Sequence, residues 1–237
     1  MKKIFTLFFA LFLMAFCAKA QFLLQEGFES ATLPTGWTII DNDGDGFNWF
    51  PTMSTTENYS YHSGSGCITS ASWDSDEGAL TPDNWLITPA INLTSNATLT
   101  FWVVGQDPDY AEENYSVYVA TSNTVAAFTA TTAVLTGVST DTYTQKSVDL
   151  SAYTGQTVYI AFRHHITSDM FMLNIDDVEI FALPTNPTIT VVPTAIDFGT
   201  ISMPGNSVST ANITAYNLTA GITATTAAPF EVSADST

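Results

Sequence analysis

The sequence has 237 residues, of which 46% are hydrophobic and 12% are charged, and its 23 acidic residues outnumber 5 basic ones to give a net charge of −18 at pH 7. Nucleic acids and anionic membranes attract proteins through basic patches, so this balance excludes both as partners. A surface this acidic instead favours solubility, cation binding or positively charged partners.

Residues 1–20 have the organisation of a secretory signal peptide. Lys2 and Lys3 form a charged start, residues 4–16 form an apolar run, and Ala18-Lys19-Ala20 is a small-residue cleavage site. No later apolar run is long enough to span a bilayer, so we expect a secreted, extracellular protein without membrane insertion. Cleavage would remove three basic residues and no acidic one, which leaves 2 basic and 23 acidic residues and a net charge of about −21.

Residues 21–183 are typical of an all-β domain. Aromatic and β-branched residues are frequent, turn residues recur at short intervals, and no segment keeps a helical period of apolar residues. Strands are predicted at Leu99–Val104, Tyr115–Ala120 and Thr157–Phe162. Regular strands separated by Gly, Asn, Asp and Ser turns over roughly 160 residues predict a sandwich of two sheets.

A strongly acidic loop follows an early predicted strand. Asp41, Asp43 and Asp45 alternate with Asn42 and glycine. Like charges this close repel, so either a cation or several backbone N–H groups should lie among them, and carboxylate oxygens at this spacing suit Ca²⁺. An EF-hand is excluded because Thr52 stands where its final Glu should be and no amphipathic helix flanks the loop. The alternative is a solvated acidic turn without an ion.

The apolar pattern reverses its phase within residues 171–181. Apolar side chains occupy odd positions up to Ile175 and even positions from Val178 onward, and the change falls at Asp176 and Asp177. A strand changes phase in this way through a bulge, which would present the two carboxylates side by side. The alternative is that the pair is simply solvated at a sheet edge.

The character of the chain changes after residue 183. Residues 184–187 are predicted to form a linker, and residues 188–237 are rich in Thr, Ala, Val and Ile with almost no charge. About fifty residues make only half of an immunoglobulin-like sandwich. We therefore expect a truncated, partial immunoglobulin-like β-sandwich here, and expect the chain to be part of a longer multidomain protein.

The tryptophans suggest where a ligand could bind. All five lie in the first half of the all-β domain, and aromatic rings that stack on sugar faces are a common means of glycan recognition, although Trp is more often partly buried. Trp49 and Trp73, which lie beside polar loops, are the candidate ligand-binding residues. Trp102 lies within a central strand and is expected in the core.

Catalysis has little support in the sequence. Two carboxylates could serve glycoside hydrolysis, and Cys67 with a histidine could form a thiol nucleophile, but no local signature accompanies either arrangement. His164 and His165 are adjacent on a predicted strand and should point to opposite faces. We expect no enzymatic activity.

Several sequence blocks, in this order and spacing over residues 22–182, resemble the cleaved-adhesin domain, a jelly-roll module of gingipain adhesin regions and of many secreted Bacteroidetes proteins. The blocks are Gly27-Phe28-Glu29, Pro34-Thr35-Gly36-Trp37, Asp41–Trp49, Ser63-Gly64-Ser65-Gly66, Pro82–Pro89, Leu99–Val103, Glu113-Asn114-Tyr115, Leu150–Arg163 and Asn174–Val178. The resemblance implies a jelly roll similar to MAM-type and carbohydrate-binding modules, with structural Ca²⁺. It also implies that the first and last strands are neighbours.

The resemblance further implies the metal ligands. Glu29 and Asp177, with Asp176, would form one calcium site; Asp41, Asp43 and Asp45 would form or support another; and Glu113 is a further candidate ligand. The implied function is a non-catalytic adhesin module that binds an extracellular glycan or protein ligand, with surface attachment through a region beyond residue 237. The alternatives are a structural spacer domain and an accessory domain of a secreted hydrolase. In gingipains the adhesin domains follow a protease domain, whereas here the module follows the signal peptide directly, so the resemblance alone does not imply haemagglutination or haemoglobin binding.

Overall fold

The structure is a computed structural model, and residues 20–185 form one compact unit within it. The described residues are 21–53, 60–182, 188–192 and 212–216. The expected signal peptide and the linker at 184–187 lie outside them, as does most of the segment from residue 188 onward. Among the described residues, no helix is both long and apolar enough to cross a membrane.

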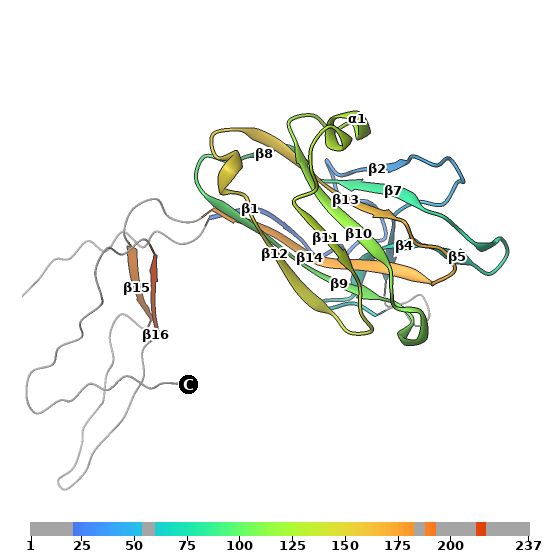
Figure 1. The fold of residues 1–237 in the computed structure, drawn as a ribbon. Coiled ribbons are helices and arrows are strands. Elements are labelled where there is room, and N and C mark those ends of the chain that lie inside the picture. The colour runs from blue at the N-terminus through green and yellow to red at the C-terminus, as the bar shows by residue number, and fades with distance from the viewer. Residues whose placement is uncertain (1–20, 54–59, 183–187, 193–211, 217–237) are drawn as a thin grey trace, which may run out of the picture. The chain divides into compact units, whose positions relative to one another are not determined.

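The unit is a sandwich of two antiparallel sheets, which confirms the predicted all-β fold class (Figure 1). The first sheet has the order β12-β9-β14-β4-β3, and β1 also pairs with β14. Its strands are β1 (Gln21–Glu26), β3 (Phe50–Met53), β4 (Gly66–Ala71), β9 (Ala97–Gly105), β12 (Thr144–Asp149) and β14 (Met172–Ala182).

The second sheet has the order β11-β10-β13-β7-β2, and the short β8 pairs with the start of β13. Its strands are β2 (Thr38–Asp41), β7 (Asp83–Ile87), β8 (Ile91–Asn92), β10 (Asn114–Ala120), β11 (Leu135–Val138) and β13 (Thr157–His165). The remaining elements are a small hairpin of β5 (Trp73–Asp74) and β6 (Gly78–Ala79), the 3₁₀ turns η1 (Pro108–Tyr110) and η2 (Ser151–Tyr153), and the short helix α1 (Val125–Thr129).

The core lies between the two sheets because every other side chain of each strand points inward. In β13, Val158, Ile160 and Phe162 are fully buried in this core, as the alternation in the sequence predicts. Phe101 of β9 meets Phe162 edge to face, with ring centroids 5.0 Å apart. The two sheets are therefore joined by aromatic packing at their centre.

The bulge predicted at Asp176 and Asp177 is present in β14. Asp176 pairs with Trp102 of β9, and Glu179 pairs with Thr100, so β14 contains one residue more than β9 over this interval. Asp177 has a positive φ of 46°. The extra residue breaks the alternation, which explains why the apolar pattern changes phase here.

A second, smaller hydrophobic cluster lies on the outer face of the second sheet beneath α1. Phe128 of α1 is fully buried and stacks on Trp85 of β7, with ring centroids 5.8 Å apart. No sequence pattern predicts this helix, because its five residues are too few to display a helical period. The helix therefore depends on packing and on its cap, Thr124, whose side chain accepts a hydrogen bond from the N–H of Ala127.

Substitution Thr124→Ala should lower the free energy of unfolding by about 1 kcal/mol, because it removes the N-cap of α1. Thr132→Ala, at an exposed position shortly after the helix, is the matched control and should change little. Urea unfolding followed by tryptophan fluorescence would report both. Equal effects of the two substitutions would show that the cap contributes nothing to stability.

Residues 188–237 are described only where β15 (Thr188–Val192) pairs antiparallel with β16 (Asn212–Tyr216). One antiparallel pair is compatible with many β folds. The immunoglobulin-like assignment of this segment therefore stays a prediction.

Candidate functional site

Three of the predicted metal ligands lie around one break in the first sheet. β9 pairs with one edge of β14 over residues 173–182, so β1 and β4 share the other edge. On that edge, β1 pairs with residues 178–182 and β4 pairs with residues 172–175. The bulge lies opposite the gap between β1 and β4. Glu29 lies shortly after the end of β1, beyond Gly27 and Phe28, so the chain brings it to the same gap as Asp176 and Asp177. The first and last strands of the sandwich are neighbours, as the resemblance implied.

One loop before β4 gathers these three carboxylates. The N–H groups of His62 and Ser63 donate to Oδ2 of Asp176 at 2.7 and 3.2 Å, and Ser63 Oγ donates to Oδ1 of Asp177 at 2.9 Å. The N–H and Oγ of Ser65 donate to Oε2 of Glu29 at 2.6 and 2.8 Å. Residues 62–65 therefore hold together carboxylates that are almost 150 positions apart in the sequence.

Two glycines make this close approach possible. A Cβ at Gly64, which has a φ of +63°, would lie 1.8 Å from Oε1 of Glu29, so no other residue fits without displacing that carboxylate. A Cβ at Gly27 would lie 3.4 Å from the same Oε1 and 3.5 Å from Oδ1 of Asp177. Oxygens from Glu29 and Asp177 therefore converge on one small space beside Gly27.

The electrostatics of this site favour a cation. Asp176 is fully buried, and this burial, together with the charge of Asp177, raises its pKa to about 6 despite the hydrogen bond from the Ser63 N–H. His62 Nδ1 lies 2.6 Å from Oδ2 of Asp177 and is the one basic group paired with these three carboxylates in the described part of the chain. Hard oxygen ligands that converge without enough positive charge are suited to Ca²⁺.

Two of the four non-glycine residues with positive φ in the described part of the chain lie at the same place. Phe28, which precedes Glu29, has a φ of +54°, and Asp177 has a φ of +46°. Bulky non-glycine residues rarely adopt this conformation, and such strain gathers at functional sites where the surroundings enforce it. Here the buried ring of Phe28, which packs edge to face on Trp37 at 5.1 Å, fixes the direction in which Glu29 leaves β1.

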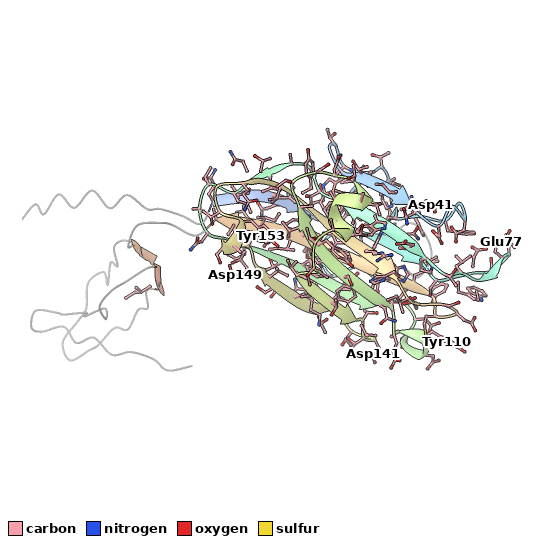
Figure 2. The ribbon with its side chains drawn as sticks, turned by 45° about the horizontal axis from the view of Figure 1, so that its top comes forward. Asp41, Glu77, Tyr110, Asp141, Asp149 and Tyr153 are labelled. Carbon is pink, nitrogen blue, oxygen red and sulfur yellow. The ribbon has the colours of Figure 1, made fainter. Side chains whose placement is uncertain are left out.

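The second predicted cluster, Asp41, Asp43 and Asp45, also comes together. Each of the three residues contributes one oxygen to a group whose atoms all lie within 4.8 Å of one another. The loop that holds them extends from β2, and Figure 2 shows Asp41 toward the same end of the sandwich as Glu77 and opposite Asp149. The arrangement matches the ligand-rich start of a calcium loop, and it is mostly exposed.

Backbone N–H groups satisfy part of this cluster. The N–H groups of Gly44 and Gly46 donate to the two oxygens of Asp41 at 2.6 and 3.0 Å, and although burial opposes them they hold the pKa of Asp41 below its usual value. Burial and the proximity of Asp41 and Asp45 raise the pKa of Asp43. The loop therefore contains both features that the sequence left open: carboxylates grouped as in a metal site, and N–H donors as in a solvated turn.

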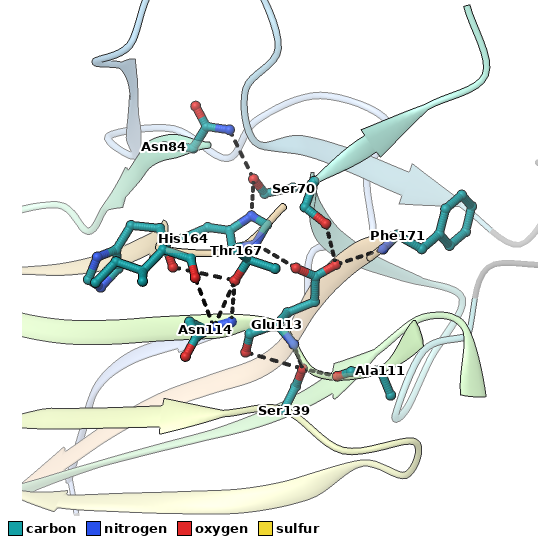
Figure 3. A network of polar contacts seen from close by, with 12 residues as sticks. Ser70, Asn84, Ala111, Glu113, Asn114, Ser139, His164, Thr167 and Phe171 are labelled. Atoms are coloured by element: carbon teal, nitrogen blue, oxygen red, sulfur yellow. Dashed lines mark hydrogen bonds and ion pairs between the residues drawn. The ribbon is translucent and has the colours of Figure 1, made fainter. Parts of the chain in front are cut away.

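Glu113 does not join either acidic cluster, which corrects its prediction as a metal ligand. It is fully buried, and three donors already surround its carboxylate: Ser72 Oγ at 2.8 Å, the N–H of Phe171 at 3.0 Å and His164 Nε2 at 2.9 Å (Figure 3). Glu113 is thus held in the buried network rather than grouped with other carboxylates, so the structure does not support it as a metal ligand. The sequence could not reveal this because the three donors come from distant strands and loops.

The network around Glu113 links a serine, a histidine and a carboxylate by consecutive hydrogen bonds. Ser70 Oγ lies 2.9 Å from His164 Nδ1, and Asn84 Nδ2 donates to the same Ser70 Oγ at 3.1 Å (Figure 3). The assignment that satisfies all partners has Ser70 donating to Nδ1 and Nε2–H donating to Glu113. Ser70, His164 and Glu113 are all fully buried, so no substrate can reach the hydroxyl, and the network serves packing rather than catalysis.

The tryptophans differ from expectation in two cases. Trp49 is only 1% exposed, and its Nε1–H donates to the carbonyl of Asn84 at 3.1 Å, so it offers no face to a ligand, which corrects that prediction. Trp102 is partly exposed on the outer face of β9 and stacks on the ring of His62 at 3.7 Å, rather than lying in the core. Trp73 is partly buried in the β5–β6 hairpin and remains a candidate.

The comparison with protein families identifies most of this domain. The family model described as the Cleaved Adhesin Domain matches residues 21–180. Hemagglutinin A of Porphyromonas gingivalis W83 is 39% identical over 182 residues, a match that covers 68% of this chain and 8% of that protein. Gingipain R1 of P. gingivalis is 40% identical over 174 residues, which covers 67% of this chain and 10% of that protein. The match thus spans about a tenth or less of these curated relatives.

Solved structures resemble the domain as a whole. The K1 cleaved adhesin domain of Lys-gingipain from P. gingivalis W83 is 41% identical with a TM-score of 0.61, and the alignment covers 68% of this chain and 98% of that domain. The K3 domain of the same protein is 38% identical with a TM-score of 0.61, covering 69% of this chain and 99% of that domain. The chain belongs to the Cleaved Adhesin Domain family.

Proposed function

We propose that this chain is a secreted, non-catalytic adhesin module that calcium stabilises and that binds an extracellular glycan or protein. The observation that carries the proposal is that residues 62–65 hold Glu29, Asp176 and Asp177 around the break between β1 and β4, with Glu29 Oε1 and Asp177 Oδ1 both beside Gly27, in a member of the Cleaved Adhesin Domain family. The burial of the Ser70–His164–Glu113 network supports a non-catalytic role. The Ser70 hydroxyl, which is the nucleophile-like group of this network, is inaccessible to solvent.

Calcium would act at this break as a structural clamp. Ca²⁺ takes six to eight oxygen ligands, and Glu29 and Asp177 direct oxygens into the space beside Gly27 while Asp176 supports the loop from its buried position. An ion here would neutralise the carboxylates and join the end of β1 to the bulge of β14. The cluster at Asp41, Asp43 and Asp45 would take a second, more exposed ion.

The setting proposed for the module is the extracellular space, as part of a longer multidomain chain. The supporting observations are the signal-like residues 1–20 and the match to about a tenth or less of much longer P. gingivalis proteins. One of these relatives carries the name Hemagglutinin A, which makes red-cell glycans and proteins reasonable first ligands to test.

A structural spacer is the second candidate function. The observation in its favour is that Trp37, Trp49 and Trp85 are all at least nine-tenths buried and cannot serve as sugar-stacking platforms. A spacer would need calcium for stiffness but would bind nothing.

Binding to erythrocytes and to a printed glycan array, measured with calcium and again in EDTA, separates the two functions. An adhesin should bind in calcium, and should lose binding in EDTA and in the Glu29→Gln/Asp177→Asn double variant. A protein that calcium stabilises but that binds neither erythrocytes nor any glycan would instead be a spacer.

A further inference from the structure

A shallow groove of about 350 Å³ lies on the outer face of the second sheet, and none of its lining residues belongs to either acidic cluster. Side chains from β10, β11 and the end of β13 line it. Tyr115 and Val117 of β10 point into the core, so Ser116 between them points outward, and Thr136 of β11 is its cross-strand partner on the same face. The residues that define this groove, called the β10–β11 groove below, are Asn114, Ser116, Thr136, Val138, His165 and Ile166.

The floor of the groove is polar but uncharged. Ser116 is only 3% exposed, and its Oγ lies 2.8 Å from His165 Nε2. Burial first, and then the nearby charge of Arg163, lower the pKa of His165 to about 4, so its ring is neutral at physiological pH. No Asp, Glu, Lys or Arg is among the residues that line the groove. Ser116 therefore supports the His165 ring from below, and the groove offers the exposed Thr136 hydroxyl with the partly exposed His165 imidazole and Asn114 amide, all without charge, in a protein whose net charge is strongly negative.

The rim of the groove is apolar, exposed and strained. Ile166 is 81% exposed and Val138 is 48% exposed. Ile166 also has a φ of +58°, a conformation that is unfavourable for a β-branched residue. Its carbonyl accepts a hydrogen bond from Asn114 Nδ2 at 3.1 Å, which holds the loop after β13 over the groove. A strained, exposed isoleucine contributes little to the core, and strain of this kind is typical of ligand clamps.

This combination matches one class of ligand. A saccharide presents hydroxyl groups at its edge and C–H groups on its faces, which complement a polar neutral floor and an apolar rim. The volume is at the lower end of the range for small-ligand sites, about 300–1,000 Å³, so a short ligand fits. Anionic ligands are disfavoured because the groove has no cation and the protein repels negative charge. A large protein partner needs far more area, about 800 Å² on each side.

We propose that the β10–β11 groove binds a short neutral oligosaccharide, with Thr136, His165 and Asn114 toward its hydroxyls and Ile166 and Val138 against its C–H face. This proposal rests on the proposed adhesin function and places its ligand at one defined surface.

The test is an NMR titration of the ¹⁵N-labelled protein, in calcium, with β-1,4-galactotriose, xylotriose and cellotriose, and with 3′-sialyllactose as an anionic comparison. A neutral trisaccharide should give saturable shifts centred on residues 114–116, 136–138 and 165–166. Thr136→Trp fills the groove from an exposed strand position and should weaken binding at least tenfold. Ser147→Trp, at an exposed position on edge strand β12 of the other sheet, is the matched control and should leave binding unchanged.

A second variant separates binding from folding. Ile166→Gly removes the rim and relieves the positive φ, so it should weaken binding several-fold while the melting temperature stays the same or rises. A residue with a purely structural role would instead lower the melting temperature when removed.

The possible outcomes distinguish failure of the groove proposal from failure of the proposed adhesin function. Shifts centred elsewhere, for example on Trp73, or binding that survives Thr136→Trp, would overturn the groove and leave the adhesin function standing. Preferential binding of 3′-sialyllactose would also overturn it. If no saccharide bound while erythrocyte binding persisted, the groove proposal would fail and the adhesin function would stand with a different ligand. If neither bound, the adhesin function itself would fail.

Discussion

Calcium at about a hundred times its dissociation constant is expected to raise the free energy of unfolding by about 2.7 kcal/mol per site, and by about 4.1 kcal/mol at a thousand times. The reason is that the ion binds the folded arrangement of Glu29, Asp176 and Asp177, which the unfolded chain cannot reproduce because the residues are far apart in sequence. Thermal unfolding in EDTA and across a calcium titration would measure the effect.

Substitutions at the acidic site show which residues bind the stabilising calcium ion. Glu29→Gln combined with Asp177→Asn should reduce the calcium-dependent rise in melting temperature by the contribution of one site, while raising stability in EDTA, because the repulsion among the carboxylates disappears. Glu179→Gln is the matched control, since Glu179 lies on the same strand and hydrogen-bonds only the exposed Gln25 among the contacts seen. If calcium did not change the melting temperature, both acidic clusters would be hydrogen-bonded turns that hold no calcium.

Loss of Glu113 is the second large effect. Glu113→Leu should lower the free energy of unfolding by about 3–5 kcal/mol, because it leaves His164 Nε2, Ser72 Oγ and the N–H of Phe171 buried without their acceptor. Glu113→Gln keeps an oxygen for Ser72 and Phe171 and should cost less. Guanidinium unfolding in saturating calcium would compare the two.

The adjacent Glu112 provides the control for this experiment. It is exposed, so Glu112→Leu should change the free energy of unfolding by no more than about 0.5 kcal/mol. If Glu113→Leu were no more harmful than Glu112→Leu, the buried network would contribute nothing to stability. Calcium-dependent stabilisation should persist in Glu113→Leu, because Glu113 lies in neither acidic cluster.

The sequence predicted features that depend on local patterns. The phase reversal at Asp176 and Asp177 required a bulge, and the structure has one. The alternation in β13 placed His164 and His165 on opposite faces, and His164 is buried while His165 lines the outer groove. Such features follow from the period-2 geometry of a strand, which each segment carries in its own residues.

The features that escaped prediction depend on partners distant in sequence. Residues 62–65 supply the donors of the acidic site, yet Ser63-Gly64-Ser65 looks like an ordinary turn until the bulge is placed beside it. Trp49 is adjacent to a polar loop, but its ring packs inward near His164. A central strand of the first sheet can leave one face partly open, which is why Trp102 is not in the core.

The number of calcium ions bound by the purified protein, measured by isothermal titration calorimetry, tests the central claim most directly. We expect the wild-type protein and Glu179→Gln to bind the same number, and Glu29→Gln/Asp177→Asn to bind one fewer. Asp43→Asn combined with Asp45→Asn should remove a different ion if the loop after β2 is the second site. An unchanged stoichiometry in the Glu29→Gln/Asp177→Asn variant would contradict a calcium site at the break between β1 and β4.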